Sequence, residues 1–95
     1  MEFNSRRVRL REVDDRDIGD FIRHLNYPEI AYFQCYDYPF TEKSAEELFG
    51  KIRELKKYDP RRGYYFAIDC HDNFAGYIDL EGVNNVNRTG YLSYW

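Results

Sequence analysis

The sequence of 95 residues lacks most features of secreted, membrane-spanning or nucleic-acid-binding chains. Its two cysteines, Cys35 and Cys70, lie far apart and form no CxxC pair, so free thiols are expected in a chain without an export signal. No apolar run approaches the roughly 20 residues that cross a membrane. The net charge of −3 gives no general attraction for nucleic acid. We therefore expect a cytoplasmic protein with no nucleic-acid partner and no membrane partner.

Metal-binding and phosphate-binding motifs are also missing. His24 follows an apolar helical face and His71 falls in a turn, so the histidines and cysteines lack the close spacing of metal ligands. The six glycines, at positions 19, 50, 63, 76, 82 and 90, form no glycine-rich cluster that could cradle a phosphate. The sequence therefore predicts no metal site.

Aromatic residues are unusually frequent, at 19% of the chain with ten tyrosines. Tyrosine is apolar along its ring and polar at its tip, so it suits a cleft or an interface as well as a core. Residues 34–40 show neither helical nor strand periodicity and carry Tyr36, Tyr38 and Phe40. These rings either cover the core or face a ligand, and the sequence leaves both alternatives open.

The first half of the chain predicts one strand and three helical segments. Residues 1–5 are expected to be frayed, and residues 7–13 alternate as a half-buried strand whose arginines face solvent. Asp14 or Asp15 caps a helix over residues 15–25, which Asn26 ends before Pro28. A short helical turn is expected near residues 28–33. A second amphipathic helix begins at Thr41 or Ser44, with Glu47 and Lys51 as an i, i+4 pair.

The second half predicts three strands joined by two turns. Residues 64–70, 74–80 and 91–95 are dense in apolar and aromatic residues, and polar clusters at residues 71–73 and 84–88 separate them. The expected order is β-α-α-β-β-β. A chain of this length forms a single domain, and an antiparallel meander with the helices ahead of it indicates an α+β fold with helices packed on a mostly antiparallel sheet.

Five short motifs stand in a fixed order: Arg9-Leu10-Arg11, the acidic run from Asp14 to Asp17, Asn26-Tyr27-Pro28-Glu29, Gly76-Tyr77-Ile78-Asp79-Leu80, and Asn87-Arg88 with Tyr94-Trp95. This ordered set resembles the N-terminal half of the GNAT acetyltransferases, especially the branch of the ribosomal-protein N-terminal acetyltransferases. The resemblance implies the acyl-CoA N-acyltransferase fold. It also implies transfer of an acetyl group from acetyl-CoA to an amine.

One part of the family pattern has no counterpart in this sequence. In the family, the strand similar to residues 90–95 leads into a glycine-containing loop that binds the pyrophosphate of acetyl-CoA. The sequence stops at Trp95, before such a loop. We therefore expect residues 1–95 to form a partial domain that is inactive by itself and does not bind acetyl-CoA alone.

The resemblance also implies roles for particular residues. The backbone of Leu92, Ser93 and Tyr94 would lie near the thioester, and the side chains of Ser93 and Tyr94 are the candidates for a catalytic role. Tyr36, Tyr38 and Phe40 would line the acceptor side. Asp79 or Glu81 would help to bind a cationic amine. Each role has a structural alternative. The backbone of residues 92–94 would only pair strands, the loop aromatics would only cover the core, and Asp79 and Glu81 would be ordinary acids on a strand surface.

A non-catalytic binding or assembly module is the alternative function. The strand at residues 91–95 carries no charge or proline, the devices that usually protect a sheet edge from pairing with another chain. This predicts a homo-oligomer such as a dimer, or pairing with a complementing C-terminal half.

Overall fold

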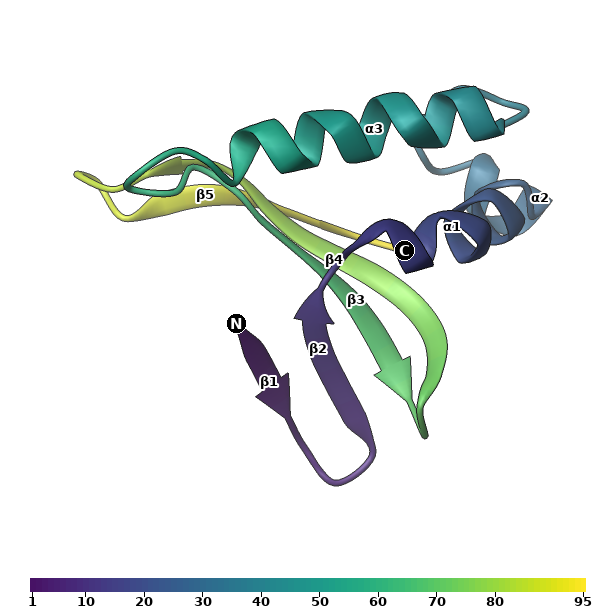
Figure 1. Ribbon diagram of the computed structural model, residues 1–95, viewed down its shortest axis with the longest axis horizontal. Helices are drawn as coiled ribbons and strands as arrows, with labels where there is room; N and C mark the ends of the chain where they lie inside the picture. The colour runs from purple at the N-terminus through teal and green to yellow at the C-terminus, as the bar shows by residue number, and fades with distance from the viewer.

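The computed structural model describes residues 1–95 and contains one five-stranded sheet (Figure 1). The strands lie in the order β1-β2-β3-β4-β5, and every neighbouring pair is antiparallel. Their bounds are β1 Glu2–Asn4, β2 Val8–Glu12, β3 Tyr64–Cys70, β4 Asn73–Asn84 and β5 Thr89–Tyr94. The helices are the 3-10 helix η1 (Asp15–Asp17), α1 (Ile18–Leu25), α2 (Pro28–Ala31) and α3 (Glu42–Leu55). The predicted α+β fold is confirmed.

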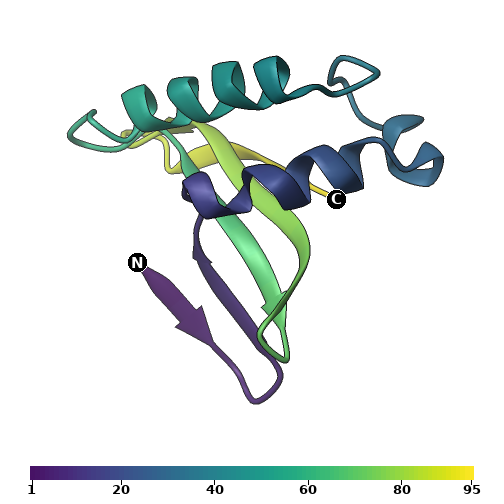
Figure 2. The ribbon, with the colours of Figure 1, turned by 45° about the vertical axis from the view of Figure 1, so that its right-hand side comes forward.

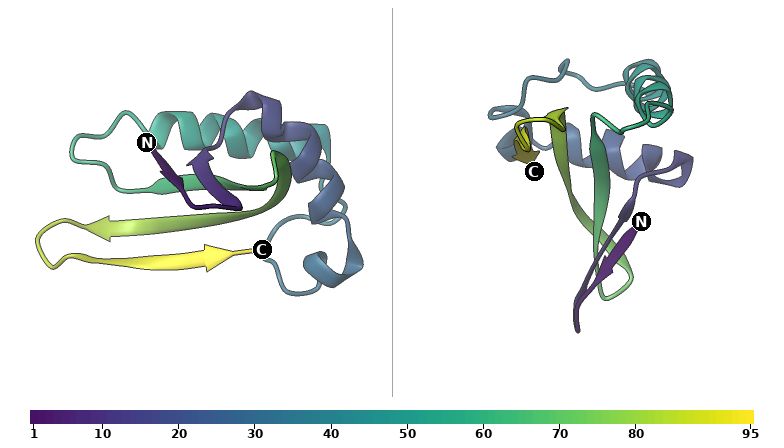
Figure 3. Two further views of the ribbon diagram at one scale, coloured as in Figure 1. Left: turned by 90° about the horizontal axis from the view of Figure 1, so that it is seen from below. Right: turned by 90° about the vertical axis from the view of Figure 1, so that its left-hand side faces the viewer.

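Strand β1 was not predicted, because residues 1–5 were expected to be frayed. It pairs with β2, with Phe3 opposite Leu10. The ring of Phe3 also meets that of Phe66 edge-on, with centroids 5.7 Å apart. The hairpin with β2 is local, but the contact with Phe66 joins residues far apart in the sequence, and a three-residue strand gives little signal of its own. The hairpin of β1 and β2 projects away from α3 (Figures 1 and 3).

The helix caps follow the sequence closely. Asp14 accepts a hydrogen bond from the backbone N–H of Arg16, and its own N–H donates to Asp17, which forms a capping box before α1. Asn26 ends α1 as predicted. Thr41 caps α3 by accepting a bond from the N–H of Ser44, so of the two predicted starts Thr41 is the correct one.

Helices α1 and α3 pack against each other on one face of the sheet (Figures 2 and 3). Phe21 of α1 lies at the centre, with its ring edge-on to Phe49, Tyr77 and Trp95 at centroid distances of 4.8, 5.1 and 4.9 Å. Side chains from both helices, from β3 and from the connections before η1 and before α3 complete the core: Val13, Leu25, Phe40, Ala45, Ile52, Tyr65 and Ala67. None of the helices has the length and apolar character needed to span a bilayer.

The arginines of β2 do not line a solvated face as predicted. Arg11 is only 9% exposed. Its guanidinium donates two hydrogen bonds to Asp17, at 2.9 and 2.7 Å, and its Nε donates to Asp69 at 2.7 Å. Arg9 donates to the same carboxylate of Asp69 at 3.2 Å. These two acids, from η1 and β3, supply the negative charge that allows the arginine face to turn toward the helices.

Candidate functional site

An open cavity of about 550 Å³ lies between the loop after α2, helix α3 and the strands β4 and β5. Its floor is the helix-facing side of the sheet. The lining residues are Phe33, Gln34, Cys35 and Tyr36 from the loop, Leu48 and Lys51 from α3, and Tyr77, Asp79, Glu81, Ser93 and Tyr94 from the strands. No group of three or more His, Cys, Asp or Glu side chains converges in a way that could hold a metal ion.

Strand geometry places the polar groups of the floor. Alternate residues of a strand share one face, so Tyr77, Asp79 and Glu81 all point toward the cavity. The register of β4 and β5 sets Ser93 directly opposite Asp79. Gly76 permits this close pairing, because a Cβ atom at this position would lie 2.6 Å from the backbone oxygen of Trp95.

Asp79 is a buried carboxylate held by hydroxyl groups. It is 3% exposed, and it accepts hydrogen bonds from the Tyr77 hydroxyl at 2.7 Å and from the Ser93 hydroxyl at 2.6 Å. No lysine or arginine forms an ion pair with it. Burial, together with the hydrogen bond to Asp79, raises the pKa of Tyr77 above its ordinary value. Tyr77 therefore stays neutral and remains a donor to Asp79.

Glu81 lies on the same face of β4 but is exposed at the rim of the cavity. Partial burial of its carboxyl and the nearby charge of Asp79 raise the pKa of Glu81, and the positive charge of Lys51 offsets part of this rise. Glu81 forms no ion pair, and a hydrogen bond from the Tyr65 hydroxyl acts against the rise in its pKa. Of the two acids in the cavity, Glu81 is the exposed one, so a ligand can reach its carboxylate from solvent.

Tyr36 is the loop aromatic that faces this cavity. Burial raises the pKa of Tyr36 to about 12, and the charges of Asp79 and Glu81 contribute in the same direction. Its ring packs edge-on against Phe40, at a centroid distance of 5.7 Å. The Tyr36 hydroxyl is therefore neutral at physiological pH and can donate a hydrogen bond near the two carboxylates.

The structure separates the three loop aromatics that the sequence grouped together. Tyr36 lines the cavity, whereas Tyr38 is 64% exposed and does not line it. Phe40 is 3% exposed and belongs to the hydrophobic core. The reason is Asn26, whose side chain bonds the backbone N–H and C=O of Phe40 at 2.8 Å each and so fixes that residue over the core.

The structure also separates the three residues proposed near the thioester. In an antiparallel ladder, the backbone groups of alternate residues face the partner strand. Since Trp95 exchanges both backbone hydrogen bonds with Tyr77, the backbone of Ser93 faces β4, and that of Leu92 and Tyr94 faces the open edge. The Ser93 hydroxyl is itself committed to Asp79. The side chain of Leu92 is 64% exposed and does not line the cavity.

Six cavity residues were not singled out as site residues from the sequence: Phe33, Gln34, Cys35, Leu48, Lys51 and Tyr77. Lys51 was interpreted as the partner of Glu47, but no ion pair joins these two side chains. For Tyr77 a signal was present, because it stands two residues before Asp79 and so shares its face of the strand. Gln34 and Cys35 lie in an aperiodic loop, where no sequence pattern gives orientation.

Comparison with known proteins identifies the fold and the family. The sequence matches the family model described as an acetyltransferase (GNAT) domain over residues 7–95. None of the curated proteins in the comparison matches significantly. Among solved structures, the chain is similar to RimL, a ribosomal L7/L12 alpha-N-protein acetyltransferase in complex with coenzyme A, with a TM-score of 0.78 and 17% identity over 96% of this chain and 52% of that chain.

Two further structures show the same fold. An acetyl transferase from Salmonella typhimurium that modifies an N-terminal serine has a TM-score of 0.77 and 18% identity, over 100% of this chain and 55% of that chain. A chimera of the spermidine N-acetyltransferase SpeG from Vibrio cholerae and hSSAT has a TM-score of 0.69 and 23% identity, over 94% of this chain and 49% of that chain. The chain thus spans about half the length of each of these structures. Because the family model covers nearly the whole sequence, the chain belongs to the GNAT acetyltransferase family.

Proposed function

We propose that this chain supplies the amine-binding side of an N-acetyltransferase site. In the reaction, the acceptor nitrogen attacks the thioester carbonyl of acetyl-CoA. The C–N bond forms, the C–S bond breaks, the amine loses a proton and the thiol of CoA leaves. The observation that carries the proposal is the buried Asp79 carboxylate, which has hydroxyl partners but no basic partner and lies on the floor of an open cavity. A cationic ligand in this cavity would supply the missing counter-charge.

The two acids have different roles in this proposal. Asp79 has one oxygen bonded by Tyr77 and the other by Ser93, so it acts on the ligand through its charge and not by direct contact. Glu81 is exposed at the rim of the cavity and contacts the ammonium group. A carboxylate with a raised pKa is also better matched to accept the proton that the amine must lose. Ser93 is then a positioning residue for Asp79, in place of the catalytic candidate that the sequence indicated.

Acetyl-CoA is the acetyl donor that the family implies. On this chain, the backbone N–H groups of Leu92 and Tyr94 at the edge of β5 could donate to the thioester carbonyl. Gly76 and Gly90 do not leave room for a pyrophosphate group. The space beside Gly76 is filled by Trp95, and the space beside Gly90 is filled by Leu80. We therefore propose that these 95 residues by themselves bind acetyl-CoA weakly or not at all. Calorimetric titration tests this, and saturable binding would contradict it.

An amine titration tests the acceptor site directly. We expect glycinamide, added to ¹⁵N-labelled protein at neutral pH, to shift the backbone amide signals of Asp79, Glu81 and Ser93. Glu81→Gln should weaken this binding, because it removes the contacting charge. Glu46→Gln, an equal charge change on the exposed face of α3, is the matched control and should leave it unchanged. Shifts that avoid the cavity, or a Glu81→Gln variant that binds as well as the parent, would refute the proposal.

A second candidate function, assembly through β5, is favoured by a separate observation. Strand β5 forms one edge of the sheet, and Tyr91, Leu92 and Tyr94 are 80%, 64% and 68% exposed. Such an edge can pair with a second copy of the chain or with a complementing segment of the same fold. Light scattering over a concentration series tests the first partner. Leu92→Lys should shift the equilibrium toward the monomer, and a strict monomer at every concentration would exclude self-pairing.

A further inference from the structure

Lys51 places an unpaired positive charge in the cavity. The basic residues at the C-terminal end of α3 and just after it are engaged: Arg53 pairs with Asp15, Lys57 pairs with Glu54, and Lys56 donates to the backbone oxygen of Val13. Lys51 forms neither an ion pair nor a hydrogen bond, and it lines the cavity beside Leu48 on the wall formed by α3. Its ammonium group is therefore free to meet a ligand.

The charge opposite Lys51 also lacks an ion-pair partner. Glu81 lines the same cavity from β4 and has no ion-pair partner. Burial and the charge of Asp79 raise the pKa of Glu81, and Lys51 is close enough to offset part of this rise. Lys51 and Glu81 form no ion pair with each other. The cavity thus presents two opposite charges on facing walls that do not neutralise each other by contact.

We infer that Lys51 selects acceptor amines that carry an acidic group close to the amine, such as an N-terminal residue followed by Asp or Glu. This rests on the proposed function, because the amine is taken to lie at Glu81. The acidic group then reaches Lys51 across the cavity. A polyamine would instead bring a second ammonium group toward Lys51, and this repulsion selects against it.

The size of the cavity agrees with this ligand class. A volume of about 550 Å³ lies within the range of small-ligand pockets and has room for a dipeptide. The rings of Phe33 and Tyr36 on the loop side offer apolar and hydroxyl contacts to the peptide between its two charges. The cavity is open, so each charge contact is exposed to solvent and contributes modestly to affinity.

Three dipeptide amides test the inference: Ala-Glu, Ala-Gln and Ala-Lys, each with a free N-terminus and an amidated C-terminus. They share the N-terminal amine, and their second side chain is acidic, neutral or basic; Glu and Gln are also nearly the same in size and shape. NMR titration at low salt should show Ala-Glu binding about threefold more tightly than Ala-Gln, and Ala-Lys about threefold more weakly, as expected for partly exposed charge pairs. Free glutamate, as a fourth probe, tells whether a small amino acid serves as well as a peptide N-terminus.

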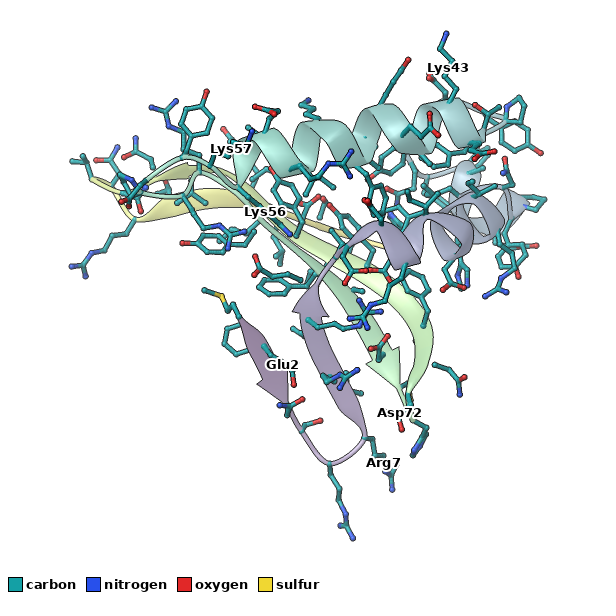
Figure 4. The ribbon with its side chains drawn as sticks, viewed as in Figure 1. Glu2, Arg7, Lys43, Lys56, Lys57 and Asp72 are labelled. Carbon is teal, nitrogen blue, oxygen red and sulfur yellow. The ribbon has the colours of Figure 1, made fainter.

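Charge reversal then assigns the preference to one residue. Lys51→Glu should reverse the order of Ala-Glu and Ala-Lys. Lys43→Glu makes the same change in the first turn of α3, where Lys43 points away from the sheet in Figure 4, and should keep the parental order. Equal binding of the three dipeptides at the cavity would overturn the role of Lys51 and leave the amine site standing. If no probe shifts the cavity signals, the amine site fails as well.

Discussion

Replacing Arg11 by methionine should destabilise the protein far more than the same change at a surface arginine. Arg11 binds Asp17 and Asp69 together, and both carboxylates are buried. Arg11→Met leaves two buried acids without their shared counter-ion, except for the contact from Arg9 to Asp69. Removing one partner of a buried ion pair costs about 3–5 kcal/mol, so we expect a loss in the free energy of unfolding of about this size.

Arg53→Met provides the matched control. Arg53 pairs with Asp15 on the surface, where both side chains are more than half exposed. An exposed pair of this kind contributes at most about 1 kcal/mol. The assay is urea unfolding followed by the fluorescence of Trp95, the only tryptophan, whose ring contacts Phe21 in the core. If Arg11→Met costs no more than Arg53→Met, the buried network does not stabilise the fold and our reasoning is wrong.

The pH dependence of the same variant gives a second check. Burial alone would raise the pKa of Asp69, but hydrogen bonds from Arg11 and Arg9 lower it overall. A carboxyl with a lowered pKa in the folded state stabilises the protein above its unfolded pKa, about 3.9, and this contribution is lost as the pH falls through the folded pKa. Without Arg11, burial dominates, and protonation relieves the buried charge. The difference in stability between parent and variant should therefore be largest at neutral pH and shrink on acidification.

Two further predictions concern close packing and capping. Gly76→Ala should lower the free energy of unfolding by about 1–3 kcal/mol, because the added Cβ would lie 2.6 Å from the Trp95 backbone oxygen. Gly19→Ala in α1 is the control: nothing lies within 4 Å of its Cβ, so this change should be neutral or stabilising. A similar loss at both sites in urea unfolding would refute the packing argument. Asn26→Ala should lower the free energy of unfolding by about 2 kcal/mol or more, because the backbone N–H and C=O of Phe40 lose their side-chain partners. In ¹⁵N NMR spectra, the Phe40 amide should be among the signals that change most.

The buried carboxylate of the cavity has only hydroxyl groups as hydrogen-bond partners. Tyr77 and Ser93 hold Asp79 in place without neutralising its charge, whereas Arg11 both holds and neutralises Asp69 on the neighbouring strand. The same residue type therefore serves two purposes on one face of the sheet. A carboxylate paired with arginine stabilises the fold. A carboxylate bonded only by hydroxyl groups keeps its negative charge without a counter-ion, and that charge can attract a cationic ligand.

The sequence by itself determined the elements whose signals are local. The stripes of apolar residues in α1 and α3 repeat at helical spacing, and residues 64–70 are dense in aromatic and apolar residues within β3. The caps lie within three residues of the groups they bond, so the sequence narrowed each to two nearby candidates. The face shared by Asp79 and Glu81 also follows from alternation alone. These features depend on neighbours along the chain, so they could be predicted without coordinates.

Only the tertiary structure decided which of these groups meet. The short strand β1 exists because β2 and Phe66 are there to receive it. Arg11 turned inward because Asp17 and Asp69 come from two other elements, and alternation cannot tell a solvated charged face from a neutralised one. The cavity joins a loop, a helix and two strands, and Lys51 lines it because α3 forms one of its walls. Such contacts depend on the folded positions of segments distant in sequence, which local patterns do not encode.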